Sequence, residues 1–69
     1  MSFKIRRRIN GEKIDQWFTG HCINQKPLFT SNRLEVKKFA TQKKAMELVI
    51  MICHYFGSAQ MCYVEESPW

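Results

Sequence analysis

The stretch that most constrains the fold covers residues 41–56 and has the pattern of an amphipathic helix. Thr41 suits the N-cap position, and Gly57 suits the residue that ends the helix. Apolar residues recur at three- and four-residue steps and form one continuous helical face, namely Ala45, Leu48, Val49, Ile52, Cys53 and Phe56. Because the flanking segments have strand patterns, we expect this face to pack on a sheet.

The N-terminal part predicts a β-hairpin. Residues 3–9 alternate as a strand with one mismatch at Arg7, and Asn10-Gly11 is the strongest short signal for a hairpin turn. We expect the return strand at residues 12–23, with Ile9 opposite Glu12 and the register fixed by the turn. The pairs are then Phe3 with Phe18, Ile5 with Gln16 and Arg7 with Ile14 towards the helix, and Lys4 with Trp17, Arg6 with Asp15 and Arg8 with Lys13 on the other side.

This second side of the hairpin is basic and carries Trp17, which we expect to be exposed on an open sheet face. Arg6 with Asp15 is an expected ion pair, and Lys4 over Trp17 is an expected cation–π contact, each worth at most about 1 kcal/mol when exposed. An alternative is that the chain near residues 28–29 covers Trp17. Arg7 breaks the alternation, so either its side chain snorkels from the sheet margin or the strand bulges there.

The remaining segments complete a β-β-β-α-β order. Pro27 marks a turn or loop at residues 24–27, and residues 28–32 either extend a long third strand or form a loop against the core. Alternation at residues 33–39 predicts the third strand, and residues 61–66 predict the fourth. A crossover through the helix would make the fourth strand parallel to residues 33–39. The expected fold class is α+β, a single small domain whose twisted, mostly antiparallel sheet has one helix packed on one face.

Charge is distributed unevenly along the 69 residues. All 11 Lys and Arg lie in residues 1–44 with three acids, whereas residues 45–69 hold three acids and no Lys or Arg. This asymmetry favours nucleic acid or an acidic protein surface as partner, although a basic surface also serves solubility alone. A chain of this length buries only about 60% of its unfolded surface, which leaves little room for a deep substrate cleft.

Enzymatic, metal and membrane functions have weak support in the sequence. No catalytic motif is present, so we expect no enzyme and no cofactor. Adjacent ligand types point in different directions on a strand or helix, which argues against a metal site at His21, Cys22, Cys53, His54 and Cys62. Irregular cysteine spacing, the lack of an apolar span and the lack of a secretory signal predict a cytoplasmic protein without membrane association.

Three groups of residues are candidate contacts. Cations two apart on strands match the repeated charge of a phosphate backbone, and an aromatic among them can stack on a base, which selects Lys4, Arg6, Arg8, Lys13, Trp17, Arg33 and Lys37. Lys43 and Lys44 in the first helical turn are either an anion contact or two solvated lysines. An apolar surplus on the helix predicts a protein interface or a homodimer through Met46, Ile50, Met51 and Tyr55.

The strands followed by a helix with Phe39, Thr41 and Ala45 at its start resemble the arm-binding domains of phage and transposon tyrosine recombinases. They also resemble the related ethylene-response DNA-binding domain of plants. This resemblance implies that the open sheet face enters the major groove, with contacts from Lys4, Arg6, Arg8, Lys13, Trp17 and Arg33. Residues 36–65 are also similar to half of a sporulation-related peptidoglycan-binding repeat.

The expected function is that of a small non-enzymatic basic protein that engages nucleic acid or a nucleic-acid-binding complex. The general look of the chain suggests a viral protein encoded by a phage or mobile element. The alternative is a protein-interaction module or homodimer, for example an inhibitor of a host or defence protein, that acts through the apolar surplus of the helix.

Overall fold

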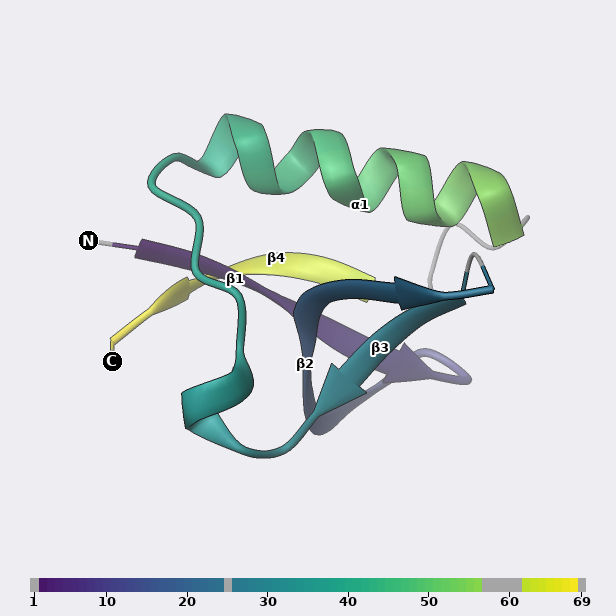
Figure 1. Ribbon diagram of the computed structural model, residues 1–69, viewed down its shortest axis with the longest axis horizontal. Coiled ribbons are helices and arrows are strands. Elements are labelled where there is room, and N and C mark those ends of the chain that lie inside the picture. The colour runs from purple at the N-terminus through teal and green to yellow at the C-terminus, as the bar shows by residue number, and fades with distance from the viewer. Residues whose placement is uncertain (1, 25, 57–61, 69) are drawn as a thin grey trace.

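The computed structural model describes residues 2–24, 26–56 and 62–68, with the side chains of residues 55 and 56 outside the description. The elements are β1 (Ser2–Ile9), β2 (Glu12–Ile23), β3 (Lys26–Thr30), a 3-10 helix η1 (Arg33–Glu35), α1 (Gln42–Phe56) and β4 (Cys62–Ser67). The strands form one sheet in the order β3-β2-β1-β4, with every pair of neighbours antiparallel. Helix α1 lies over one face of this sheet (Figure 1). The predicted α+β class and the β-β-β-α-β order are confirmed.

Helix α1 begins where its capping pattern predicts. The hydroxyl of Thr41 accepts a hydrogen bond from the backbone N–H of Lys44 at 3.3 Å, as an N-cap residue should. Every predicted core residue of the helix whose side chain is described packs in or against the core, namely Ala45, Leu48, Val49, Ile52 and Cys53. The expected stop at Gly57 lies outside the described residues.

The hairpin turn is also as predicted, but the register beyond it is not. Asn10 and Gly11 have φ angles of 53° and 81°, and positive φ at both residues is typical of a two-residue hairpin turn. Ile9 lies opposite Glu12, yet Arg6 lies opposite Trp17 instead of Asp15, because β2 bulges opposite Arg7. The register predicted beyond Arg8 is therefore wrong by two residues. An even slip keeps each side chain on its face, so the apolar alternation does not reveal it.

A bulge does occur at Arg7, but in the opposite strand. The irregularity in the β1–β2 ladder falls between Arg6 and Arg8, and the extra residues lie in β2. Nη1 of Arg7 donates to Oε1 of Gln16 at 3.0 Å. Its guanidinium carbon lies 5.4 Å from the centre of the Phe29 ring.

The strand predicted at residues 33–39 is wrong. The third strand is β3, on the edge of the sheet, where the missing N–H of Pro27 is tolerated. The chain then turns through η1, capped by Asn32, whose Oδ1 accepts from the Leu34 N–H at 3.1 Å. Val36 and Phe39 are the buried residues of this segment, and their three-residue spacing differs from the two-residue period of a strand.

The segment after η1 is nonetheless tied to the sheet. The backbone N–H of Lys37 donates to the carbonyl of Phe18 at 2.9 Å. Phe39 exchanges two backbone hydrogen bonds with Phe3, of 2.9 and 2.8 Å, and forms an isolated bridge. These bonds fix the backbone that leads into α1.

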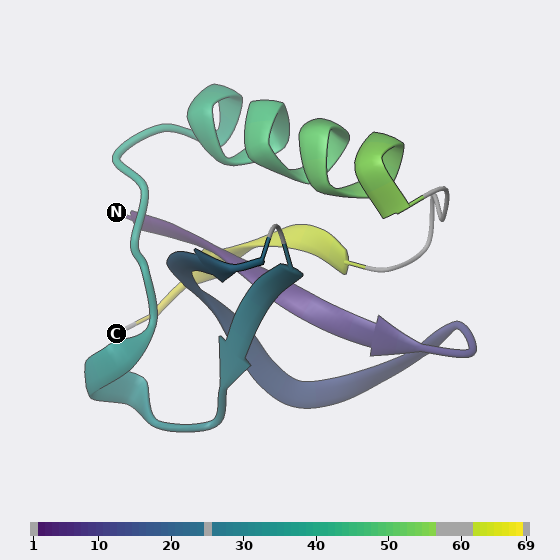
Figure 2. The ribbon, with the colours of Figure 1, turned by 45° about the vertical axis from the view of Figure 1, so that its right-hand side comes forward.

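The expected parallel position of β4 is wrong as well. β4 pairs antiparallel with β1, with Ile5 opposite Val64 and Arg7 opposite Cys62. The connection through α1 carries the chain from one edge of the sheet to the other (Figure 2). As a result β1 is a central strand, and its side chains have neighbours from β2 and β4 on both sides.

Candidate functional site

The sheet face away from α1 carries a row of three basic side chains from β1, Lys4, Arg6 and Arg8. Antiparallel pairing puts residues from the two neighbouring strands beside this row, namely Lys13 and Trp17 from β2 and Tyr63 and Glu65 from β4.

Glu65 is the acidic centre of this face. Its Oε1 accepts a hydrogen bond from Trp17 Nε1 at 2.8 Å and lies 3.4 Å from Lys4 Nζ. Its Oε2 accepts from the Tyr63 hydroxyl at 3.4 Å and lies 3.6 Å from Arg6 Nη1. Burial alone would raise the pKa of Glu65, but the Trp17 hydrogen bond and the charges of Arg6 and Lys4 outweigh it and lower that pKa. Glu65 is therefore an ionised counter-charge inside the basic row.

Two of the predicted contacts on this face are confirmed. Arg6 Nη2 lies 2.8 Å from Asp15 Oδ1, and Lys4 Nζ lies 4.6 Å from the centre of the Trp17 ring. The pKa of Arg6 is raised, mainly by its interaction with Tyr63 and further by the charges of Glu65 and Asp15.

The expectation that this face lies open with an exposed tryptophan is wrong. Trp17 is 9% exposed and Lys4 is 3% exposed. Sequence reasoning missed Glu65 because it placed the last strand beside residues 33–39, whereas β4 actually lies beside β1. The signal was the alternation of Tyr63 and Glu65, which gives them the same face of the strand.

Arg8 and Lys13 lie together at the hairpin end of the same face. They are direct partners across β1 and β2. The Arg8 guanidinium carbon lies 4.3 Å from the centre of the Tyr63 ring, and Lys13 Nζ lies 5.3 Å from the same point. Neither forms an ion pair with an acid of the described residues. We call Arg8 and Lys13 the Tyr63 cation pair.

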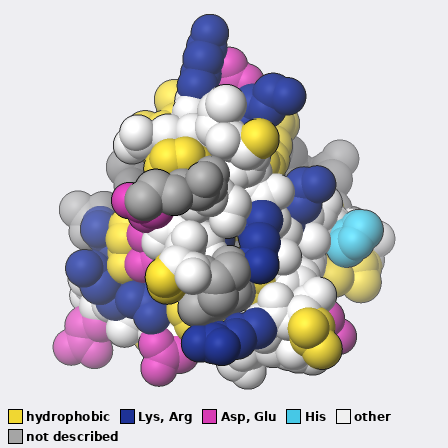
Figure 3. All heavy atoms as spheres, turned by 90° about the vertical axis from the view of Figure 1, so that its left-hand side faces the viewer, with side chains coloured by type: hydrophobic (Ala, Val, Ile, Leu, Met, Phe, Trp, Pro, Cys, Tyr) yellow, Lys and Arg dark blue, Asp and Glu magenta, His cyan; other side chains and the backbone are white. Residues whose placement is uncertain are grey.

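A second basic surface lies on the segment between the sheet and the helix. Residues 33–44 contain five exposed cations and one acid, Glu35. We call these five cations the basic segment: Arg33, Lys37, Lys38, Lys43 and Lys44. Figure 3 looks onto this side of the molecule and shows Lys and Arg side chains from its top to its bottom. Arg33 and Lys37 were expected on the open sheet face, and that prediction is wrong because their strand does not form.

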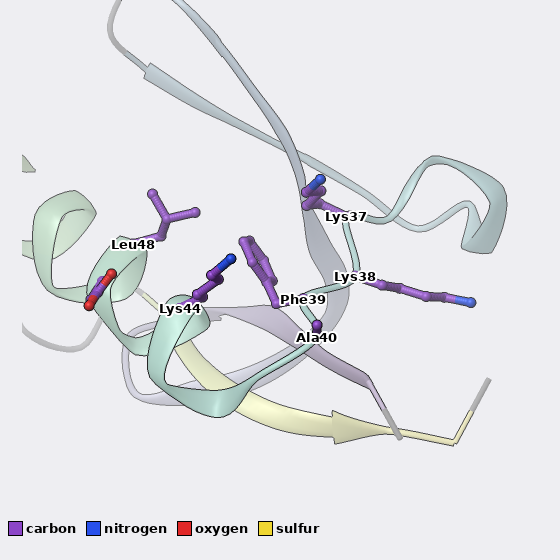
Figure 4. Close-up of a pocket in the computed structure, with 7 residues that line it drawn as sticks. Lys37, Lys38, Phe39, Ala40, Lys44 and Leu48 are labelled. Carbon is purple, nitrogen blue, oxygen red and sulfur yellow. The ribbon is translucent and has the colours of Figure 1, made fainter.

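The basic segment borders a shallow hollow of about 430 Å³ beside the first turns of α1. Lys44 extends from the helix towards Phe39, whereas Lys38 points away (Figure 4). Lys37 Nζ lies 6.0 Å from the centre of the Phe39 ring. Glu47 and Leu48 complete the helical side of the hollow.

The outer side of α1 carries three accessible apolar side chains. Met46 is 42% exposed, Ile50 63% and Met51 59%. These three residues are therefore accessible, as a protein interface requires. The side chain of Tyr55, the fourth candidate, is outside the described residues.

Of the candidate metal ligands, Cys53 and Cys62 are neighbours. Among the residues described, no group of three or more His, Cys, Asp or Glu side chains comes close enough to hold a metal ion. Cys22 is exposed, whereas Cys62 is buried, and burial is the main cause that raises its pKa to about 12. Within the described part of the chain, no helix is long and apolar enough to cross a bilayer.

Comparison with known proteins finds no family model, no curated protein and no solved structure that matches this chain.

Proposed function

We propose that this protein is a small non-enzymatic protein that binds nucleic acid through its exposed cations. The observation that supports this most strongly is the basic segment, with five exposed cations against one acid in residues 33–44. A polyanion that meets such a surface releases condensed counterions, and this release supplies most of the affinity of sequence-independent binding. An origin in a phage or mobile element and a cytoplasmic location belong to the same proposal and rest on the sequence pattern alone.

The backbone of the basic segment is anchored at several points, which favours binding. Lys37 and Phe39 are hydrogen-bonded to β2 and β1, and the caps of Asn32 and Thr41 fix η1 and the start of α1. A backbone that is ordered before binding loses less conformational entropy when the ligand arrives.

The proposed contacts differ from those implied by the recombinase resemblance. Lys4 and Trp17 are buried, and Arg6 is paired with Asp15 and Glu65, so none of these is a main contact. The contacts assigned are the basic segment together with Arg8 and Lys13. The protein would then bind the phosphate backbone through charged side chains, and no exposed aromatic side chain would recognise bases.

The proposal is tested with charge reversals at exposed lysines. Lys43→Glu puts an acid in the first turn of α1, where the helix dipole favours it, so the fold should be retained. Lys26→Glu is the matched control, because it makes the same change of charge at an exposed lysine on β3, outside the basic segment. The measurement is fluorescence anisotropy with random duplex and single-stranded oligonucleotides at low salt.

We expect Lys43→Glu to weaken binding several-fold more than Lys26→Glu, and Lys43→Glu with Lys44→Glu to weaken it further. Removal of one phosphate contact should also reduce the salt slope by about 1. Unchanged affinity in the double variant would refute the role of the basic segment.

A second candidate function is protein binding through the outer side of α1, favoured by the exposure of Met46, Ile50 and Met51. Apolar surface of this kind marks protein interfaces, and methionine adapts its shape to a partner. Met51→Glu should leave the fold intact and dissociate an oligomer or partner complex. Sedimentation velocity of the wild-type protein and of Met51→Glu measures this. Monomeric profiles for both would speak against self-association.

A further inference from the structure

We infer that the Tyr63 cation pair, Arg8 and Lys13, is a binding site for one phosphate group of a nucleic-acid backbone. The inference rests on the proposed function for the source of the phosphate, and on the geometry of the sheet for the site itself.

The two cations are held together by the sheet and by one aromatic ring. Arg8 and Lys13 are direct partners on neighbouring strands, so their side chains leave the sheet side by side on the same face. Tyr63 comes from β4, on the other side of β1, where it is the partner of Arg6. Its ring centre nevertheless lies 4.3 Å from the Arg8 guanidinium and 5.3 Å from the Lys13 ammonium. The Tyr63 ring therefore lies near both a cation of β1 and a cation of β2.

The acids nearest to this pair are engaged elsewhere. Asp15 is paired with Arg6, and Glu65 with Lys4 and Arg6. Glu12 precedes Lys13 on β2 and so points to the opposite face of the strand. Two like charges thus share one ring without a carboxylate partner among the described residues, and an anion between them would relieve their repulsion.

The donors of the pair suit phosphate in particular. Nε of Arg8 is buried, so the terminal guanidinium nitrogens are the donors that a ligand can reach, and no hydrogen bond joins them to another described residue. The guanidinium of Arg8 lies against the Tyr63 ring, and the paired N–H groups of a guanidinium match two oxygens of a phosphate. Lys13 is exposed and adds a mobile point charge beside this fork.

The test is an NMR titration of the isotope-labelled full chain, first with inorganic phosphate and then with a thymidine dinucleotide, which contains one phosphodiester. The Arg8 Nε–Hε signal and the Tyr63 ring signals should shift and saturate with both probes. Arg8→Gln and Lys13→Gln should each lower the affinity about tenfold, because each removes one charge-assisted contact. Lys26→Gln, which removes the same charge from an exposed lysine on β3, should leave the affinity unchanged.

Arg8→Lys separates the planar fork from the charge, because it keeps the charge and loses the fork, and we expect it to bind phosphate more weakly than the wild-type protein but more tightly than Arg8→Gln. Equal affinities of Arg8→Gln, Lys13→Gln and Lys26→Gln for both probes would overturn the site. If long oligonucleotides still bind all three equally, the proposed function stands without this site. If the probes bind as expected while oligonucleotides do not bind the wild-type protein, the site stands and the proposed function falls.

Discussion

Glu65 balances the charge of the sheet face that lies away from the helix. Lys4 is 3% exposed, and a buried ammonium without a partner carries a large desolvation cost. Glu65 meets this lysine at 3.4 Å and also accepts the Trp17 hydrogen bond. Both contacts join strands that are far apart in the sequence, so Glu65 couples β4 to β1 and β2.

Glu65→Gln should reduce the free energy of unfolding by about 1–3 kcal/mol at neutral pH, because the buried lysine loses its counter-charge. Glu66→Gln is the control, since Glu66 is the exposed neighbour on the same strand. Urea denaturation of both variants measures the difference. Equal stabilities would show that Glu65 contributes nothing beyond an exposed carboxylate.

The stability should also depend on acid through Glu65. Its pKa is lowered in the folded protein, so the unfolded chain takes up the proton first as the pH falls. The contribution of Glu65 is present above its ordinary pKa of 4.5 and is lost as the pH falls through the lower folded value. Glu65→Gln should therefore flatten the loss of stability in this acidic range. A wild-type profile and a variant profile with the same slope would contradict this.

The cysteines should differ in reactivity in the folded protein. Cys22 is exposed, whereas Cys62 is buried and has a pKa raised to about 12, so little thiolate forms there. Brief treatment with iodoacetamide near neutral pH should label Cys22 first and leave Cys62 unmodified until urea is added. Peptide mass spectrometry reads the sites, and equal labelling of both in the native state would contradict the burial of Cys62.

At the scale of elements, α1 has one side in the core and one in solvent. Ile52 is 6% exposed and Ile50 is 63% exposed, although they are two residues apart on the same helix. Ile52→Ala should reduce the free energy of unfolding by about 2–5 kcal/mol, because it leaves a cavity against the sheet. Ile50→Ala should change it by less than about 0.5 kcal/mol. Denaturant titrations that give similar losses for both would place α1 in a different rotation on the sheet.

Local patterns predicted the elements whose partners lie nearby in the sequence. The helical face from Ala45 to Cys53 and the turn at Asn10-Gly11 depend on neighbouring residues only, and both were correct. The strand at residues 33–39 failed because Lys37 and Phe39 anchor an irregular segment by backbone hydrogen bonds to β2 and β1, which no local period encodes. The position of β4 failed because pairing between distant segments depends on tertiary packing.

Two of the candidate contacts on the sheet were predictable from the alternation of side chains along the hairpin. Arg6 met Asp15 and Lys4 met Trp17 despite the wrong register, because a slip of two residues keeps both partners on one face. Their contacts with Glu65 were not predictable, because they depend on β4 pairing with β1.

At the scale of the whole molecule, the exposed cations of the described residues cluster in two places. The basic segment covers the side that leads from η1 into α1, and the Tyr63 cation pair lies at the hairpin end of the sheet face. The outer side of α1 carries the exposed apolar side chains of Met46, Ile50 and Met51. A polyanion and a protein partner would therefore use different surfaces, and substitutions can separate the two functions.

The central claim, that exposed cations of this protein bind the phosphate backbone, is tested most directly by the salt dependence of oligonucleotide binding. Fluorescence anisotropy with a random duplex and a random single strand should be recorded over a series of salt concentrations. With four or more phosphate contacts, we expect log K for duplex to fall against log salt with a slope of about −3.6 or steeper. Absence of binding at low salt, or binding that does not weaken with salt, would contradict the claim and turn attention to α1 and a protein partner.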